Sequence, residues 1–342
     1  MAEFSSALPV IDHLDADRFS ALGEAPVLIV DAARFVRFPA PVQAVIIGID
    51  QDGALPPVDA ADFDLLLTTA PNPARPWVGL PGARFMQKVE ALAQAVRTWP
   101  VAATMTCQTL RITEALPFDR ALMVESFAYS TVLAGGEFAR WRTGRTLAAS
   151  MNANTGRELV RYERDEDQVV LTLDSPETRN AMTAPMRDAL YGALANVLDD
   201  PTRPDIVLQG AGKCFSTGGA LAEFGTAGDV AQAHIIRTLH ACARAVDALG
   251  CRITARLHGA CIGSGLEIPA SAARCEALAG SFFQLPELRM GLMPGAGGTA
   301  SVTRRIGRHR TLWMVLSGER LGVQQALDYG LIDAVRDTPW KP

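Results

Sequence analysis

Short apolar runs bounded by turn-forming residues dominate the first part of the chain. Three of them cover residues 27–30, 45–49 and 65–67, with Pro- and Asp-rich connections between them. Runs of this kind are typical of strands that are covered on both faces of a sheet. In residues 85–98 and 119–141, apolar positions instead recur every three or four residues, which predicts two helices. We therefore expect the segment 1–150 to form an α/β accessory domain.

A polar, charge-rich stretch at residues 152–167 predicts the start of a second domain, over 151–342. Beyond it, strand-like and helix-like segments alternate. Strands are predicted at 168–174, 205–209 and 252–257, and helices are predicted after the cap residue Thr183 and over about 229–249. Alternation of this kind implies crossover connections and a largely parallel sheet. The predicted fold class is therefore α/β.

Composition places the chain among ordinary soluble proteins. Hydrophobic residues make up 49% and charged residues 20%, and the net charge of −5 gives no general attraction for nucleic acid or anionic lipid. The N-terminus lacks the basic residues of a signal peptide, and no apolar run approaches the roughly 20 residues of a membrane span. The six cysteines form no CxxC pair. We therefore expect a cytoplasmic protein that binds neither nucleic acid nor membrane.

Several polar groups do not form a recognisable motif. Asp31, Asp50 and Asp52 follow predicted strands, and we interpret them as solvated loop acids. The five histidines have no metal-ligand spacing, so no metal site is expected. One local basic patch could bind a phosphate; it consists of Arg304, Arg305, Arg308 and Arg310.

Two glycine-rich turns, 210–221 and 258–267, each follow a predicted strand and precede a helical stretch. Backbone N–H groups at such turns are able to point toward an anion or a carbonyl oxygen. The context of Lys213 is not that of a phosphate-binding loop, and no GxGxxG opens a helix, so a nucleotide motif is absent from the sequence. Neither Ser216 nor Ser264 has the glycine offsets of a nucleophile elbow. The turns therefore indicate backbone donors rather than a nucleophile.

Two glutamates accompany these turns. Glu267 falls in the first helical turn after the second glycine-rich turn, where the helix dipole favours a carboxylate. Glu287 lies in an apolar, Pro- and Gly-punctuated stretch and should be partly buried, which raises the pKa of a carboxyl group and makes it a proton donor near neutrality. Two carboxylates beside two turns with free N–H groups form an arrangement that polarises a carbonyl and moves protons beside it.

Four segments, 175–182, 210–221, 259–267 and 286–299, resemble the successive signatures of the enoyl-CoA hydratase/isomerase (crotonase) superfamily. The resemblance covers about residues 160–336. It implies a crotonase-like spiral of ββα repeats that binds acyl-CoA thioesters. It also implies that coenzyme A enters as part of the substrate with no separate cofactor, and that the chain forms a homo-oligomer, either a trimer or a hexamer.

The resemblance also assigns roles to individual residues. The N–H groups of Gly219 and Ser264 would form the oxyanion hole that stabilises the thioester enolate. Glu267 would activate water for attack at the β-carbon, and Glu287 would exchange the proton at the α-carbon. The substrate-binding residues implied in the same way are Gly219, Ala220, Leu221, Ala222, Ser264 and Gly295. The chain departs from the family's pattern at Ser264, where glycine is usual, and at Ala220, where aspartate is usual.

Hydration of an enoyl-CoA, a reaction of fatty acid metabolism, is the predicted activity. Single-acid isomerases of the family usually lack the first glutamate, which is present here as Glu267. Dienoyl isomerases carry an aspartate eight positions after the second glutamate, where this chain has Gly295. The alternatives that stay open are an enoyl-CoA isomerase, an acyl-CoA thioester hydrolase and a non-catalytic scaffold that has kept the fold.

Family members normally continue, past the position of Pro342, with helices that cover the acyl pocket and build the trimer. Residues 121–145 resemble those helices, with Glu125 and Phe138 in corresponding places. We hypothesise that the first segment is a degenerate crotonase-like half whose last helices cap the active core. The hypothesis requires residues 119–145 to lie near the two glutamates. An unrelated accessory domain is the alternative.

Overall fold

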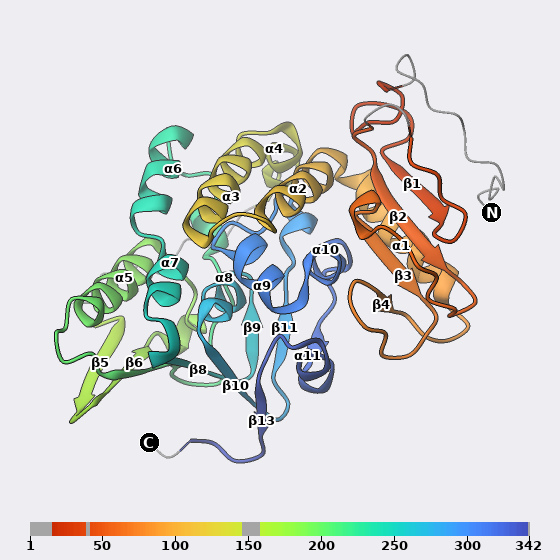
Figure 1. Cartoon of the computed structure of the whole chain (residues 1–342). Coiled ribbons are helices and arrows are strands. Elements are labelled where there is room, and N and C mark those ends of the chain that lie inside the picture. The colour runs from red at the N-terminus through yellow and green to blue at the C-terminus, as the bar shows by residue number, and fades with distance from the viewer. Residues whose placement is uncertain (1–15, 39–41, 146–157, 341–342) are drawn as a thin grey trace.

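The computed structural model describes residues 16–38, 42–145 and 158–340, and Figure 1 shows their arrangement. The first part of the chain contains β1 (Val27–Asp31), β2 (Val45–Asp50), β3 (Leu65–Thr68), β4 (Val78–Gly79), α1 (Phe85–Thr98), α2 (Pro100–Thr113), α3 (Phe118–Leu133) and α4 (Gly136–Arg142). The second part contains β5 (Val160–Asp165), β6 (Gln168–Leu173), α5 (Ala184–Leu198), β7 (Asp205–Gly210), α6 (Val230–Leu239), α7 (Cys242–Ala248), β8 (Ile253–Leu257), β9 (Ala260–Ile262), α8 (Ser264–Glu267), β10 (Arg274–Leu278), β11 (Phe282–Gln284), α9 (Gly298–Ile306), α10 (Arg308–Ser317), β12 (Leu321–Gly322), α11 (Val323–Tyr329) and β13 (Ala334–Arg336).

Parallel pairing predominates in the sheets. β1 to β4 form a four-stranded parallel sheet in sequential order. The largest sheet has the order β13-β10-β8-β7-β6-β5, in which the edge pair β5 and β6 is antiparallel and the other pairs are parallel. A three-stranded sheet pairs β9 with β11 in parallel and β11 with β12 antiparallel. This organisation confirms the predicted α/β class.

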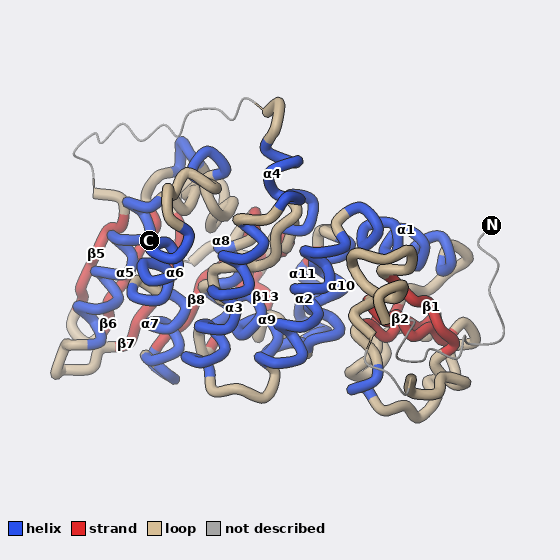
Figure 2. Tube along the Cα trace, turned by 90° about the horizontal axis from the view of Figure 1, so that it is seen from above, coloured by secondary structure: helices blue, strands red, loops and turns tan. Residues whose placement is uncertain are grey.

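The two parts of the chain share one hydrophobic core. Figure 2 shows the four-stranded sheet at one end, the six-stranded sheet at the other, and α2, α3, α9 and α10 between them. The same cluster of buried side chains includes Ile47 and Leu67 from the four-stranded sheet, called the small sheet from here on, and Leu171 and Ala255 from the six-stranded sheet. Helix α3 packs against α2, α6 and α9. A helix from the first part of the chain is therefore built into the second part.

The predicted strands at 27–30, 45–49 and 65–67 are confirmed as β1, β2 and β3, and the predicted helix at 85–98 is confirmed as α1. Helix α2 was not predicted, because buried threonines interrupt its apolar pattern. Thr106 and Thr109 fit inside the helix because their hydroxyls donate to the carbonyls of the preceding turn, Ala102 O and Met105 O. No helix among the described residues is long and apolar enough to cross a membrane.

Two predicted helices are each divided in the structure. The stretch 119–141 becomes α3 and α4, which separate at Gly135, a residue with extended backbone. The stretch 229–249 becomes α6 and α7, which separate at His240 and Ala241. No glycine or proline marks this second break. A tertiary contact stabilises it instead, since His240 Nδ1 lies 2.8 Å from Asp188 Oδ1 on α5.

The interpretation of Asp50 as a solvated acid is wrong. Its side chain is buried, and it accepts hydrogen bonds from Thr68 Oγ1 (2.7 Å) and from the backbone N–H groups of Leu55 (2.9 Å) and Ala54 (3.2 Å). Burial alone would raise the pKa of Asp50, but these hydrogen bonds lower it overall. Asp50 therefore holds the loop that follows β2, whereas Asp31 and Asp52 are exposed, as predicted.

The predicted basic patch is divided in the structure, because Arg304 is exposed whereas Arg308 and Arg310 are buried. Arg308 and Arg310 are each only 5% exposed, because α10 inserts them between the two parts of the chain. Arg308 Nη1 donates to Phe63 O (2.7 Å) and its Nε to Glu114 Oε2 (3.0 Å), while Arg310 Nη2 donates to Pro73 O (2.6 Å). These guanidinium groups donate to carbonyls in the loops that connect the strands of the four-stranded sheet. They fasten that sheet to the core rather than bind a phosphate.

Replacing Arg308 by Met should loosen the attachment of the small sheet. The variant leaves buried carbonyls without donors, each at a cost of about 1–3 kcal/mol, so we expect the free energy of unfolding to fall by about 2–4 kcal/mol. Urea titration measures this change. Arg34→Met, which removes an arginine that is 80% exposed and 3.6 Å from Asp31, is the control and should cost less than about 1 kcal/mol. Equal losses in the two variants would contradict the role of Arg308.

Candidate active site

The two glycine-rich turns lie side by side. The N–H of Ile262 donates to Ser216 O (3.1 Å), which joins one turn to the other. Gly218 has a φ of +85°, and a Cβ atom there would lie 2.5 Å from Ile262 O, so only glycine fits. This close packing brings Gly219 from one turn and Ser264 from the other onto the wall of the same cavity.

The backbone N–H groups of Gly219 and Ser264 have no hydrogen-bond acceptor among the residues that the structure describes. Ser264 is the first residue of α8, and the first N–H groups of a helix have no acceptor within it. Both residues line a cavity with a volume of about 230 Å³. Two free N–H groups on a cavity wall are able to stabilise negative charge on a carbonyl oxygen.

Glu267 and Glu287 converge on this cavity. Glu267 ends α8 and is 2% exposed, and Glu287 begins the 3₁₀ turn Glu287–Met290 after β11 and is 6% exposed. Both carboxylates approach Gly263, whose φ is +52°. A Cβ atom on Gly263 would lie 2.8 Å from Glu287 Oε1 and 3.9 Å from Glu267 Oε1. The absence of a side chain at this position therefore allows the two carboxylates to meet next to the N–H of Ser264.

The surroundings of Glu267 favour a group that ionises near neutrality. Burial raises the pKa of this carboxyl group, and hydrogen bonds from the backbone N–H groups of Ala296 (2.7 Å) and Gly298 (3.0 Å) to its Oε2 oppose the rise. The resulting pKa is about 7. At that value the carboxylate is suited to accept and release a proton at physiological pH.

Glu287 has a different environment. Its Oε2 atom is buried and has no hydrogen-bond partner within the described part of the chain. Burial and the negative charge of Glu267 raise the pKa of Glu287 well above the usual value of a glutamate. These surroundings favour the protonated form of the Glu287 carboxyl group, which is the form able to donate a proton into the cavity.

A third buried carboxylate, Glu125 of α3, lines the same cavity. It accepts hydrogen bonds from the N–H groups of Gly297 (2.7 Å) and Thr299 (2.8 Å) and from the Thr299 hydroxyl (2.7 Å). Burial and the charge of Glu267 raise the pKa of Glu125 to about 8, against the opposing effect of these hydrogen bonds. The N–H groups of residues 296 and 298 thus donate to Glu267, and those of residues 297 and 299 donate to Glu125.

The sequence alone assigns Glu125 no role at the site beyond its correspondence to a position in a capping helix. A single carboxylate on the otherwise apolar face of a helix was the available signal, but its partners lie more than 170 positions away in the chain. Among the described residues, the three glutamates and their neighbours do not form a group that could hold a metal ion. Backbone N–H groups hold two of the three carboxylates, those of Glu125 and Glu267.

Helix α3 forms one wall of the cavity, as the capping hypothesis requires. Leu122, Ser126 and Tyr129 of α3 line the cavity together with both glutamates. The Tyr129 ring packs directly on Gly295 and leaves no room for a side chain there. The position of residues 119–145 is thus compatible with a capping segment. That the first part of the chain is a degenerate crotonase-like half stays a hypothesis, and its predicted boundary near residue 150 lies outside the described residues.

The structure separates the expected substrate-binding residues into two groups. Gly219, Ser264 and Gly295 line the cavity. Ala220, Leu221 and Ala222 do not line it; they lie in the segment that follows Gly219, where Leu221 is 44% exposed. A part for these three residues in binding the pantetheine arm stays a prediction.

The raised pKa of Glu287 predicts a pH dependence of stability. A carboxyl group whose pKa is raised by folding stabilises the protein below its unfolded pKa of about 4.5, and this stability is lost as the pH rises. Each such group changes the free energy of unfolding by about −1.4 kcal/mol per pH unit above that value. We expect Glu287→Gln to remove one such contribution between pH 5 and 7, measured by urea titration. Glu319→Gln, at an exposed position, is the control, and identical slopes in wild type and Glu287→Gln would contradict the assignment.

The second part of the chain is similar to known proteins. Residues 163–338 match the family described as "Enoyl-CoA hydratase/isomerase". A "Probable enoyl-CoA hydratase" of Rhodobacter capsulatus is 32% identical over 183 residues, which cover 53% of this chain and 70% of the relative. The "Fatty acid oxidation complex subunit alpha" of Shewanella sp. is 32% identical over 179 residues, which cover 50% of this chain but only 25% of that subunit.

The chain is also similar to solved structures of other proteins. An enoyl-CoA hydratase from Thermoplasma volcanium GSS1 has 30% sequence identity and a TM-score of 0.48, with 54% of this chain and 74% of that chain covered. The family match covers just over half of the chain. It contains all four segments on which the resemblance is based. The chain therefore belongs to the enoyl-CoA hydratase/isomerase family.

Proposed function

We propose that the protein is an enoyl-CoA hydratase, which adds water across the 2,3 double bond of an enoyl-CoA thioester or catalyses the reverse reaction. Family membership supports a CoA thioester as substrate. The observation that carries the proposal is the convergence of Glu267 and Glu287 on Gly263, beside the free N–H of Ser264. Addition of water is not an oxidation or reduction, so the proposed reaction needs no redox cofactor.

The proposed mechanism starts at the thioester carbonyl. Its oxygen accepts hydrogen bonds from the N–H groups of Gly219 and Ser264, which stabilise the negative charge of the enolate. Glu267, as carboxylate, takes a proton from water while the water oxygen bonds to C3 of the enoyl group. Protonated Glu287 then gives its proton to C2, and the enolate returns to a thioester. A proton passes from Glu267 to Glu287, by way of solvent, to restore the starting state.

The division of roles between the two glutamates follows from their surroundings. Glu267 accepts two backbone N–H groups, and such hydrogen bonds stabilise the ionised form that a base requires. Glu287 has a buried oxygen without a partner among the described residues and a like charge beside it, and both features favour the protonated form that an acid requires. One site therefore holds a base and an acid of the same residue type.

Hydration of crotonyl-CoA, followed by the loss of enoyl-thioester absorbance, tests the proposal. General acid–base groups contribute about 10²–10⁴-fold to rate, so we expect Glu267→Gln and Glu287→Gln each to lower kcat by about that factor. Glu125→Gln keeps both reacting carboxylates and should cost about tenfold, because it disturbs only the segment that holds Glu267. Glu319→Gln should have the rate of the wild type.

Three other results would contradict the hydratase proposal. Double-bond migration without added water would favour an isomerase. Release of free CoA would favour a thioester hydrolase. Absence of binding, measured by calorimetry with butyryl-CoA, would favour a non-catalytic scaffold.

A further inference from the structure

We infer that Arg237 binds a carboxylate at the far end of the acyl group, so that the substrate is an enoyl-CoA derived from a dicarboxylic acid. The inference rests on the proposed function, because it names the substrate class of the same cavity. Arg237 lies in the last turn of α6 and lines the cavity that also holds Glu267 and Glu287. No part of the hydration mechanism uses this cation.

Arg237 is held in place by neutral groups. Its guanidinium lies over the ring of Tyr129, 4.7 Å from the ring centroid. Nη1 donates to Ser126 Oγ (2.8 Å), to Ser126 O (3.3 Å) and to Ser130 Oγ (3.1 Å), all on α3. Nε and Nη2 have no hydrogen-bond partner within the described parts of the chain, and no carboxylate there lies within 4.0 Å of the guanidinium. Nη1 therefore fixes the guanidinium group, and the N–H groups of Nε and Nη2 stay available to a ligand.

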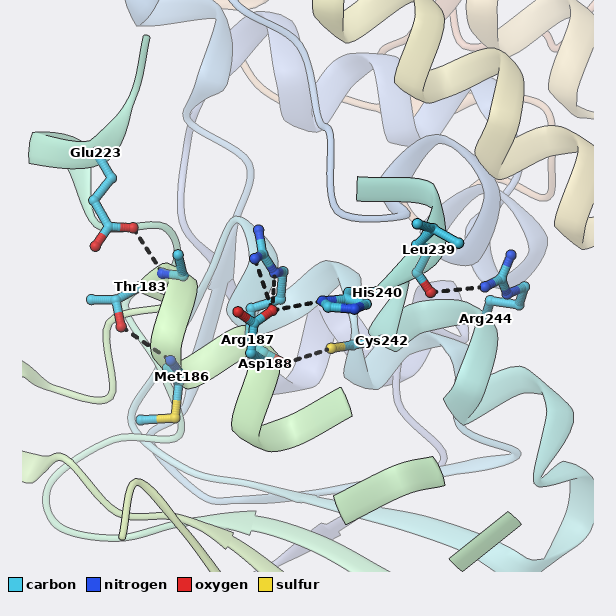
Figure 3. A network of polar contacts seen from close by, with 10 residues as sticks. Thr183, Met186, Arg187, Asp188, Glu223, Leu239, His240, Cys242 and Arg244 are labelled. Carbon is cyan, nitrogen blue, oxygen red and sulfur yellow. Dashed lines mark hydrogen bonds and ion pairs between the residues drawn. The ribbon is translucent and has the colours of Figure 1, made fainter. Parts of the chain in front are cut away.

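Other cationic groups on the cavity wall are neutralised or exposed. Figure 3 shows Arg187 and His240 on either side of Asp188, which both of them contact. Arg244, which is exposed, donates to Leu239 O (3.0 Å). Arg237 differs from these groups because it is half-buried and forms no ion pair within 4.0 Å among the described residues, and burial lowers the pKa of its guanidinium. A cation in this state gains stability from an anionic ligand.

The network in Figure 3 also fixes the direction of α6. His240 contacts Asp188 of α5, and the thiol of Cys242 donates to Arg187 O (3.5 Å), so both sides of the break between α6 and α7 are tied to the same turn of α5. Arg237 is three residues before this break. The anchored break therefore sets where the last turn of α6 directs its side chains.

The position of Arg237 favours an acyl carboxylate over the phosphates of CoA. The Tyr129 ring that carries the guanidinium packs on Gly295, and the next residue, Ala296, donates its N–H to Glu267. Only one aromatic ring thus separates Arg237 from the segment that holds the reacting carboxylate. The pantetheine arm keeps the CoA phosphates far from the thioester. A carboxylate matches the two free guanidinium donors, because arginine binds carboxylates in a two-pronged geometry.

Matched pairs of substrates test the inference. The pairs are trans-2-enoyl-CoA thioesters of five to eight carbons that end in either a carboxylate or a methyl group. We expect the best diacid to exceed its neutral partner in kcat/KM by about 10- to 100-fold, as one charged hydrogen-bonded pair allows. Arg237→Met should lower this ratio of kcat/KM values to about one or below, and Arg237→Lys should keep part of the preference for the diacid. Arg244→Met, which removes a neighbouring cation, should leave the ratio within about threefold.

A binding measurement separates failure of the inference from failure of the proposed function. Adipoyl-CoA and hexanoyl-CoA are saturated and cannot be hydrated, and calorimetry gives their affinities. Tighter binding of adipoyl-CoA by wild type, lost in Arg237→Met, supports the inference even if no enoyl-CoA is hydrated. A preference for the neutral partner at every chain length, or a ratio unchanged by Arg237→Met and Arg237→Lys, would overturn it.

Discussion

Four successive backbone N–H groups, those of residues 296–299, hold two buried carboxylates in place, and the candidate active site depends on this arrangement. Glu267 and Glu125 each accept two of them, in alternation. Displacing either carboxylate would leave buried donors without acceptors, at about 1–3 kcal/mol for each. The segment and the two carboxylates therefore fix one another. The position of the proposed base is thus set partly by a residue from the first part of the chain.

The same region shows how a protein assigns different chemistry to identical side chains. Glu125, Glu267 and Glu287 are all buried, and burial raises the pKa of each carboxyl group. They differ in how many donors face them and how close the nearest like charge lies. Glu287 has a buried oxygen without a hydrogen-bond partner among the described residues, and its pKa is raised well above the usual value of a glutamate. The number of hydrogen-bond donors around each carboxyl group, rather than burial alone, distinguishes the proposed acid from the proposed base.

Much of the candidate site could be predicted because its residues lie in short local segments that resemble the signatures of the family. Gly219, Ser264, Glu267 and Glu287 each lie in a short segment whose glycines and flanking strands are visible in the sequence, and the structure brings all four to one cavity. The strands of the small sheet were visible for the same reason, as continuous apolar runs. Local patterns of this kind do not depend on which distant segments meet.

The features that were missed depend on distant partners. Glu125 bonds to residues more than 170 positions away, and the break after α6 depends on Asp188, about 50 positions before it. Arg308 was assigned to a surface patch because its partners, the carbonyls of the small sheet, carry no sequence signal. Helix α2 was missed because threonines that return hydrogen bonds to their own helix resemble polar interruptions in an apolar pattern.

The distance along the chain between α3 and the segment that it holds has a consequence for synthesis. Glu125 leaves the ribosome 174 residues before Thr299, which corresponds to roughly 10–35 s at ordinary rates of translation. During that interval the face of α3 that will be buried, with its carboxylate, has no partner from the second part of the chain. The candidate active site is therefore among the last features to form, and α3 must remain available and unaggregated until the second part of the chain reaches it.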